Sequence, residues 1–97
     1  MFRPKPMLKK LFAIIENRKQ TMPDNSYTAT LLAAGRKRLW EKIAEESNEV
    51  ITASKQEGRK RIIEETADLI YHVFVLLAFE NIQLTELEKE LTKRSKT

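Results

Sequence analysis

Apolar residues recur along most of the chain at intervals of three and four residues, the spacing of an amphipathic α-helix. Leu8, Leu11, Phe12 and Ile15 follow this spacing. Together they predict a first helix from about Met7 to Gln20.

Glycines and turn-forming residues divide the rest of the chain into further helices. Residues 23–26 read Pro-Asp-Asn-Ser, a turn sequence, and Gly35 and Gly58 lie where helical patterns stop. No segment shows the alternation typical of a strand, so the predicted fold class is all-α. The expected helices run over 27–34, from about 36 to 58 and from about 59 to 80, followed by a last helix opened by a capping box at Thr85–Glu88.

The helix predicted over 59–80 has an unusual apolar stretch. From Leu69 to Phe79 it is apolar on every side, and such a helix must be surrounded by other elements. A domain of 97 residues can scarcely cover it alone. We therefore predict a single domain over residues 1–97, built as an all-α bundle of four main helices and completed by homodimerisation, with residues 1–6 as a disordered or extended tail.

The charge balance favours anionic partners. The chain has 18 lysines and arginines against 14 aspartates and glutamates, a formal net charge of +4. Two basic triplets, 36–38 and 59–61, each follow a glycine and so begin a helix, where acidic residues are usually preferred. Either these triplets are solvated surface or they help to bind an anion, with Arg38 and Arg61 as the candidates.

The residue inventory excludes several kinds of chemistry. There is no cysteine and His72 is the only histidine, which excludes disulfides, zinc fingers, thiol nucleophiles and multi-histidine metal sites. The longest apolar run, 69–79, is well short of the ~20 residues needed to cross a bilayer. The beginning of the chain does not resemble a signal peptide. We expect a soluble, cytoplasmic protein that does not bind membranes.

Glutamates interrupt the apolar face of the helix predicted over 36–58. Glu46 falls within the apolar arc and Glu49 at its edge, whereas Glu45 points further outward. A glutamate among apolar neighbours is costly to keep ionised and needs a partner. The arc comprises Leu39, Trp40, Ile43, Ala44, Val50, Ile51 and Ala53.

The following helix repeats this feature. Glu65, Asp68 and His72 lie on one stripe, at positions i, i+3 and i+7, and the stripe continues into apolar residues. A lone histidine on an inward stripe is more often a hydrogen-bonded core residue than a metal ligand, and we interpret His72 in that way.

The two carboxylate pairs, Glu46 with Glu49 and Glu65 with Asp68, predict a metal site between two packed helices. Mg²⁺ relieves the repulsion within such a cluster and is usually held by a few carboxylates, waters and substrate phosphates. Charged residues at this spacing are also common on solvated helices. Two pairs within apolar faces, neither followed four residues later by lysine or arginine, favour the metal. The remaining glutamates of these helices are expected to face solvent: Glu41, Glu45, Glu57, Glu64, Glu86 and Glu90.

The carboxylate pattern resembles a known signature. Glu45–Glu49, which reads EESNE, followed by Glu65–Asp68, which reads ETAD, is similar to the E-E-x-x-E and E-x-x-D motifs of the all-α, MazG-like nucleoside triphosphate pyrophosphohydrolases. Further segments resemble one branch, the phosphoribosyl-ATP pyrophosphohydrolase family, over about residues 8–91. They are SYTATLLAAG at 26–35, KIAEE at 42–46, ADLIYH at 67–72 and VLLA at 75–78.

The resemblance implies a reaction and a set of ligands. It implies Mg²⁺-dependent cleavage of the α–β phosphoanhydride of phosphoribosyl-ATP to phosphoribosyl-AMP and pyrophosphate, a step of histidine biosynthesis, in a dimeric enzyme. Glu46, Glu49, Glu65 and Asp68 would hold the metal. Glu45 or Glu46 would orient or deprotonate the attacking water.

Substrate contacts are assigned from the resemblance and the charge pattern. Lys42 would either contact a phosphate oxygen or pair with Glu46 four residues on. Tyr27 and Thr28 would approach the substrate, or simply pack as an aromatic residue beside a helix cap. The complete candidate set for substrate binding is Lys42, Tyr27, Thr28, Arg38 and Arg61.

Two other functions are weighed against this one. A housecleaning enzyme of the same superfamily, acting on ordinary or damaged nucleoside triphosphates, would use the same carboxylates. A basic helical nucleic-acid-binding module would leave the inward carboxylates unexplained, and Trp40, Phe74 and Phe79 are expected to pack in the core rather than stack on bases. The next pathway step resembles zinc-dependent hydrolysis, which needs cysteine and histidine ligands, so a separate phosphoribosyl-AMP cyclohydrolase is expected to supply it.

Overall fold

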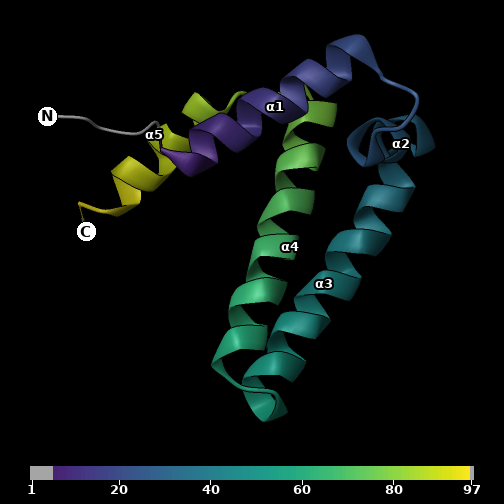
Figure 1. The fold of residues 1–97 in the computed structure, drawn as a ribbon. Coiled ribbons are helices and arrows are strands. Elements are labelled where there is room, and N and C mark those ends of the chain that lie inside the picture. Colours follow the sequence, from purple (N-terminus) through teal and green to yellow (C-terminus); the bar gives the residue numbers. More distant parts are fainter. Residues whose placement is uncertain (1–5, 97) are drawn as a thin grey trace, which may run out of the picture.

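The computed structural model describes residues 6–96, and every regular element in this part of the chain is a helix (Figure 1). The all-α prediction is therefore confirmed for the described residues, whereas most of the predicted tail lies outside them. The helices are α1 (Met7–Thr21), α2 (Tyr27–Ala34), α3 (Arg36–Gln56), α4 (Arg59–Phe79) and α5 (Leu84–Arg94).

Sequence-encoded signals set the helix ends. The Ser26 side chain caps α2 by accepting a hydrogen bond from the amide of Ala29 at 3.1 Å. Gly35 and Gly58 adopt φ of 94° and 95°, which a residue with a Cβ rarely does, and so allow sharp changes of direction before α3 and α4. Asn81, with φ of 61°, ends α4 at the predicted position.

The capping box of α5 is not where the sequence pattern placed it. The prediction of Thr85–Glu88 is wrong: the cap is Gln83, whose amide donates to the Glu86 carboxylate at 2.8 Å while the Gln83 side chain accepts from the third helical amide. The helix thus begins at Leu84, one turn after the left-handed residue Asn81. Glu86, expected to be only a solvated residue, takes part in the cap.

Apolar packing is concentrated where α1 and α2 meet the adjoining ends of α3 and α4. Phe12 and Phe74 pack edge to face with ring centroids 5.4 Å apart, and Ile15 and Val75 are fully buried. Each such side chain contributes about 1.5–3 kcal/mol through burial. The complete buried cluster is Phe12, Ile15, Leu31, Leu39, Phe74, Val75 and Ala78.

Helices α3 and α4 form a long antiparallel hairpin whose far end extends away from that core (Figure 1). Three residues placed on the apolar arc of α3 are exposed in the single chain: Trp40 by 57%, Ile51 by 51%, and the smaller Ala44. The prediction that they are buried is wrong for this chain alone, because the arc is wider than the strip that α4 covers. Phe74 is buried as predicted, and Phe79 is half-buried.

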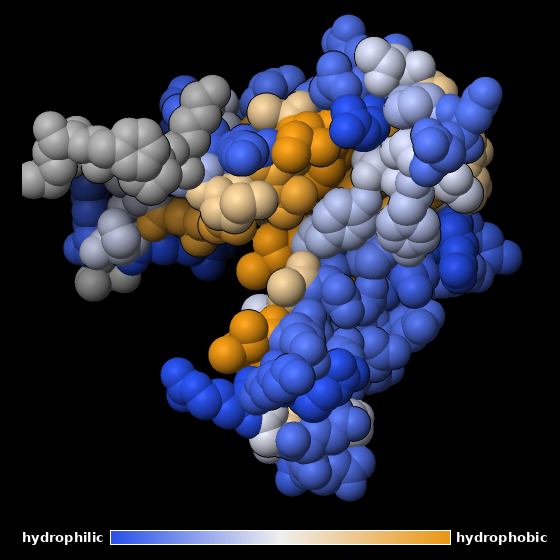
Figure 2. Space-filling view, viewed as in Figure 1, coloured by the Kyte–Doolittle hydropathy of each residue, from blue (hydrophilic) through white to orange (hydrophobic). Residues whose placement is uncertain are grey.

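The apolar stretch of α4 is only partly covered. Apolar residues gather beneath α1 and along the free edge of α4 (Figure 2). Val73, Leu76 and Leu77 are half-buried, although a helix apolar on all sides predicts full coverage. None of the helices in residues 6–96 has the length and apolar character needed to cross a membrane.

Candidate active site

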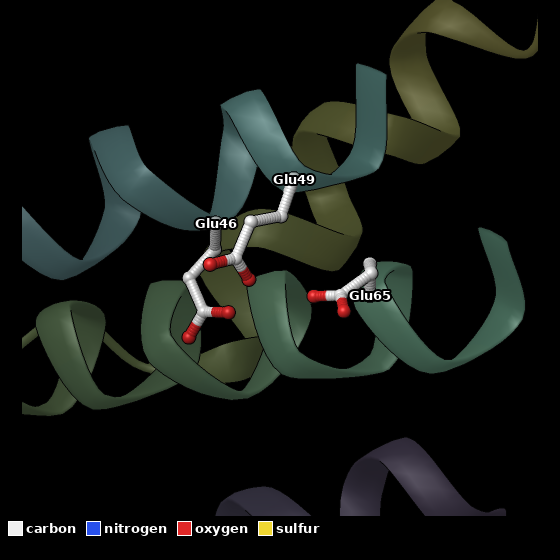
Figure 3. Close-up of side chains that lie close together, drawn as sticks. All are labelled: Glu46, Glu49 and Glu65. Atoms are coloured by element: carbon white, nitrogen blue, oxygen red, sulfur yellow. The ribbon is translucent and has the colours of Figure 1, made fainter. Parts of the chain in front are cut away.

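Three carboxylates meet where α3 and α4 face each other beyond the apolar core. Glu46 and Glu49 extend from α3 and Glu65 from α4 (Figure 3). One oxygen from each lies within 4.8 Å of the others. The three-residue spacing places both α3 glutamates on the face that packs against α4, so the sequence pattern has the predicted spatial result.

Glu65 is a buried carboxylate that could hold a metal ion. Its side chain is buried to more than nine-tenths, and its Oε2 has no hydrogen-bond partner among the described residues. A buried carboxylate oxygen without a donor is costly. Its position beside Glu46 and Glu49 offers hard oxygen ligands at close range, the donor set that Mg²⁺ prefers.

Arg61 neutralises part of this negative charge. It pairs with Oε1 of Glu65 from four residues earlier in α4, and also contacts Glu64 at 2.7 Å and Glu57 at 3.8 Å. The sequence pattern did not indicate this ion pair, because it considered only the lysines and arginines that follow a glutamate by four residues, and Arg61 precedes Glu65 by four. The neighbouring carboxylates raise the pKa of Arg61, chiefly through the hydrogen bond with Glu64 and the charge of Glu65.

Glu49 is the most solvent-accessible of the three carboxylates. A side-chain hydrogen bond with Glu65 raises the pKa of Glu49 above 4.5, and partial desolvation and the charges of Glu65, Glu46 and Glu45 raise it further. Glu49 therefore holds a proton more readily than an isolated glutamate does, and a bound divalent cation would compete with that proton.

Glu46 is held by the histidine of the stripe. His72 Nδ1 lies 2.6 Å from Oε1 of Glu46, and both side chains are buried. Its Nε2 lies 3.0 Å from the hydroxyl of Tyr27, on α2. The interpretation of His72 as a hydrogen-bonded core residue is confirmed, and its partners include a predicted metal ligand and a predicted substrate contact.

An open pocket of about 480 Å³ lies beside the cluster, and its lining is entirely polar or charged. Glu49 and Glu65 of the cluster line it together with Arg61. The lining residues are Glu45, Asn48, Glu49, Thr52, Glu57, Arg61 and Glu65. Such a pocket suits a polar, charged ligand better than an apolar one.

Three other predicted site residues do not line this pocket. Asp68 is exposed and is not one of the three clustered carboxylates, although its backbone carbonyl accepts from His72 at 2.8 Å. Lys42 was expected either to contact a phosphate oxygen or to pair with Glu46. In the structure it forms an ion pair with Glu45, at 3.7 Å. Arg38 lies on the exposed surface, 3.7 Å from Glu41, and does not line the pocket.

The two α2 residues differ in exposure. Tyr27 is 52% exposed and stacks on Tyr71 at a centroid distance of 6.2 Å. Thr28 is buried, and its hydroxyl hydrogen-bonds that of Tyr71. The role of Tyr71 was missed by the sequence analysis, although it directly precedes the singled-out His72.

Asn48, Thr52 and Glu57 were also missed as pocket residues. Asn48 and Thr52 are three and seven residues from Glu45, so helical spacing alone places them on its side of α3. That spacing was the available signal. Glu45 and Glu57 are exposed, as expected of solvated glutamates, and they also line the open pocket.

Comparison with known proteins identifies close relatives. A family model described as phosphoribosyl-ATP pyrophosphohydrolase matches residues 8–95. A phosphoribosyl-ATP pyrophosphatase of Metallosphaera sedula is 49% identical over 90 residues, covering 93% of this chain and 97% of that protein. One from Bacillus cytotoxicus is 46% identical, covering 92% and 83%. A histidine biosynthesis bifunctional protein of Pyrococcus furiosus is 46% identical over 93% of this chain, which matches 42% of that longer protein.

Proposed function

The chain belongs to the phosphoribosyl-ATP pyrophosphohydrolase family, and from this membership and the site we propose that it hydrolyses phosphoribosyl-ATP to phosphoribosyl-AMP and pyrophosphate in histidine biosynthesis. The bond broken is the α–β phosphoanhydride, and Mg²⁺ is the required metal.

The observation that supports the metal is the unpartnered buried oxygen of Glu65 beside Glu46 and Glu49. These three residues would hold Mg²⁺, and Asp68, exposed one turn along α4 from Glu65, is proposed as a fourth ligand or as a ligand of a metal-bound water. A Mg²⁺ ion held by these residues would supply positive charge to neutralise phosphate oxygens.

The residues around the cluster have separate proposed roles. Glu45 lines the pocket, is half exposed and lies outside the three-carboxylate group, so we favour it over Glu46 as the base that orients or deprotonates water. Glu46 has one oxygen engaged by His72 and is better suited to holding the metal. A base must keep a free oxygen toward water, which Glu45 does more readily.

Substrate binding is assigned to residues on two sides of the pocket. Arg61 lines it directly, and Lys42 reaches Glu45 at its edge, so both cations are proposed to contact phosphate oxygens. Tyr27 and Thr28 are proposed to contact the substrate from the beginning of α2. Arg38, which lies away from the pocket, is assigned only to electrostatic attraction of the anionic substrate.

Homodimerisation is part of the proposal. The partly uncovered apolar edge of α4 and the exposed Trp40 and Ile51 support a second copy of the chain as the covering element. A cytoplasmic location is proposed with it. Ring opening of phosphoribosyl-AMP is assigned to a separate cyclohydrolase, because this sequence has no cysteine and one histidine.

A direct assay tests the function. Purified protein is given phosphoribosyl-ATP, ATP or a deoxynucleoside triphosphate, each with Mg²⁺ or with EDTA. We expect pyrophosphate and phosphoribosyl-AMP only from the first substrate with Mg²⁺. Preferential cleavage of the ordinary triphosphates would instead support the housecleaning function, and equal turnover in EDTA would overturn the assignment of the metal.

A further inference from the structure

His72 connects two parts of the site that come from different helices. Its Nδ1 lies 2.6 Å from Oε1 of Glu46 on α3, and its Nε2 lies 3.0 Å from the hydroxyl of Tyr27 on α2. Nδ1 also lies 2.8 Å from the carbonyl oxygen of Asp68, one turn earlier in α4. One buried imidazole thus contacts both Glu46, a candidate metal ligand, and Tyr27, a candidate substrate-binding residue.

The partners define the hydrogen-bond directions. Nδ1 faces the Glu46 carboxylate and the Asp68 carbonyl, and since neither oxygen donates, Nδ1 must bear a proton and donate. In the neutral ring, Nε2 then accepts from the hydroxyl of Tyr27. Tyr27 thus donates to Nε2 of His72, and Nδ1 of His72 donates to the Asp68 carbonyl while lying 2.6 Å from Oε1 of Glu46.

Aromatic packing restricts the imidazole. The Tyr71 ring meets it nearly perpendicularly at a centroid distance of 5.2 Å, and the Tyr27 ring does so at 5.9 Å. His72 is 5% exposed, so it has little room to rotate away from Glu46 or Tyr27.

We propose that His72 is a positioning residue that fixes the Glu46 carboxylate and the Tyr27 hydroxyl at a constant separation. The inference rests on the proposed function. With Oε1 of Glu46 in contact with Nδ1 of His72, the carboxylate beside Glu49 and Glu65 cannot rotate freely. The Tyr27 hydroxyl is held by Nε2 of the same imidazole, so substrate binding does not have to order it.

Substitutions that separate the two contacts test this role. His72→Phe keeps a ring but removes both contacts, whereas His72→Asn keeps an amide donor near the Nδ1 position and loses the contact to Tyr27. Tyr27→Phe removes only the hydroxyl. The Mg²⁺ dissociation constant is measured by calorimetry on the full chain, and kcat and KM are measured with phosphoribosyl-ATP.

Removing a residue that orients a metal ligand typically weakens metal binding by about 10–100-fold, and we expect His72→Phe to do so. His72→Asn and Tyr27→Phe should each keep the Mg²⁺ affinity within about threefold of wild type. Both variants should raise KM, and the two increases should be similar in size. The double variant His72→Phe with Tyr27→Phe should have nearly the KM of His72→Phe alone, because without His72 the Tyr27 hydroxyl is no longer positioned to contact the substrate.

A matched control separates positioning from general loss of stability. Phe74→Leu alters a buried side chain two residues along α4 that packs on Phe12, and it should lower the melting temperature without changing Mg²⁺ affinity or KM. Unchanged Mg²⁺ affinity in folded His72→Phe would overturn the proposal. If His72→Phe does not fold, unchanged KM in both His72→Asn and Tyr27→Phe would overturn it.

A parallel measurement distinguishes failure of this inference from failure of the proposed function. Glu46→Gln should abolish measurable Mg²⁺ binding if Glu46 is a ligand. Wild-type affinity in Glu46→Gln would overturn the metal site, and the role of His72 with it. Loss of binding in Glu46→Gln together with wild-type behaviour in the His72 variants would overturn the positioning role alone.

Discussion

The two ends of the α3–α4 hairpin are held together by different interactions. At the end adjoining α1 and α2, Leu39, Phe74 and Val75 are buried among apolar side chains. Toward the Gly58 turn, the buried side chains are instead Glu46, Glu65 and the small Ala53 among the described residues. One end contributes stability through apolar burial, whereas the other buries carboxylates, whose desolvation is costly and is offset in part by the ion pair of Arg61 with Glu65.

This contrast assigns stability and function to different parts of the same two helices. Removing an apolar side chain at the first end should unfold the protein without altering the chemistry of the site. Neutralising a carboxylate at the second end should impair the chemistry of the site without lowering stability, because it relieves repulsion while removing a ligand. Four substitution experiments test the contrast.

The largest expected effect is at the apolar end. Phe74→Ala removes a buried ring that packs edge to face on Phe12, and large-to-small changes of this kind cost about 3–5 kcal/mol of unfolding free energy. Urea denaturation in EDTA measures the loss. Leu91→Ala, at a side chain that is 55% exposed on α5, is the control and should change stability by less than about 0.5 kcal/mol.

The reciprocal experiment removes a carboxylate. Glu46→Gln and Asp68→Asn should each lower turnover by at least about 100-fold, equivalent to about 2.7 kcal/mol of activation free energy, with unchanged helical content by circular dichroism. Stability in EDTA should be unchanged or higher. Glu90→Gln, on the exposed face of α5, is the control. Near-normal turnover in either variant would exclude that residue from the site.

Much of this contrast could be predicted from the sequence, because helical spacing specifies the direction of each side chain. The positions of Gly35, Gly58 and Asn81 predicted the helix ends to within two residues. The spacing of Glu46 and Glu49 predicted that both face α4. These are local properties, and backbone geometry alone determines them.

Contacts between helices were less predictable. The partnership of Tyr27 with His72 joins residues 45 positions apart, and no local spacing indicates it. The exposure of Trp40 and Ile51 was missed because helical periodicity shows which residues share a face, not how much of that face a neighbouring helix covers. The family resemblance included His72 in the segment ADLIYH but did not indicate that it contacts both Tyr27 and Glu46.

A smaller effect is expected when the positive charge inside the polar end is removed. Arg61 pairs with Glu65 in the metal-free protein, so Arg61→Met should lower stability in EDTA and raise Mg²⁺ affinity roughly threefold to tenfold by removing a competing cation. Calorimetry measures the affinity. Arg59→Met removes the same formal charge from the same basic triplet outside the pocket lining. Equal changes in both variants would contradict a specific role for Arg61.

The smallest expected effect is the pH dependence of the metal-free protein. The pKa of Glu49 is raised above 4.5 in the folded state, first by the hydrogen bond with Glu65, so the folded protein binds more protons than the unfolded chain above pH 4.5. The stability contributed by this group is therefore fully present below pH 4.5 and is lost as pH rises through the raised pKa. In EDTA, the melting temperature of wild type should fall over this range relative to that of Glu49→Gln. With saturating Mg²⁺, the melting temperature of wild type should instead rise with pH relative to that of Glu49→Gln. The metal binds the deprotonated carboxylate, so its stabilising effect increases as the carboxyl group loses its proton. Parallel pH profiles of the two proteins in EDTA would show that Glu49 is not coupled to the cluster.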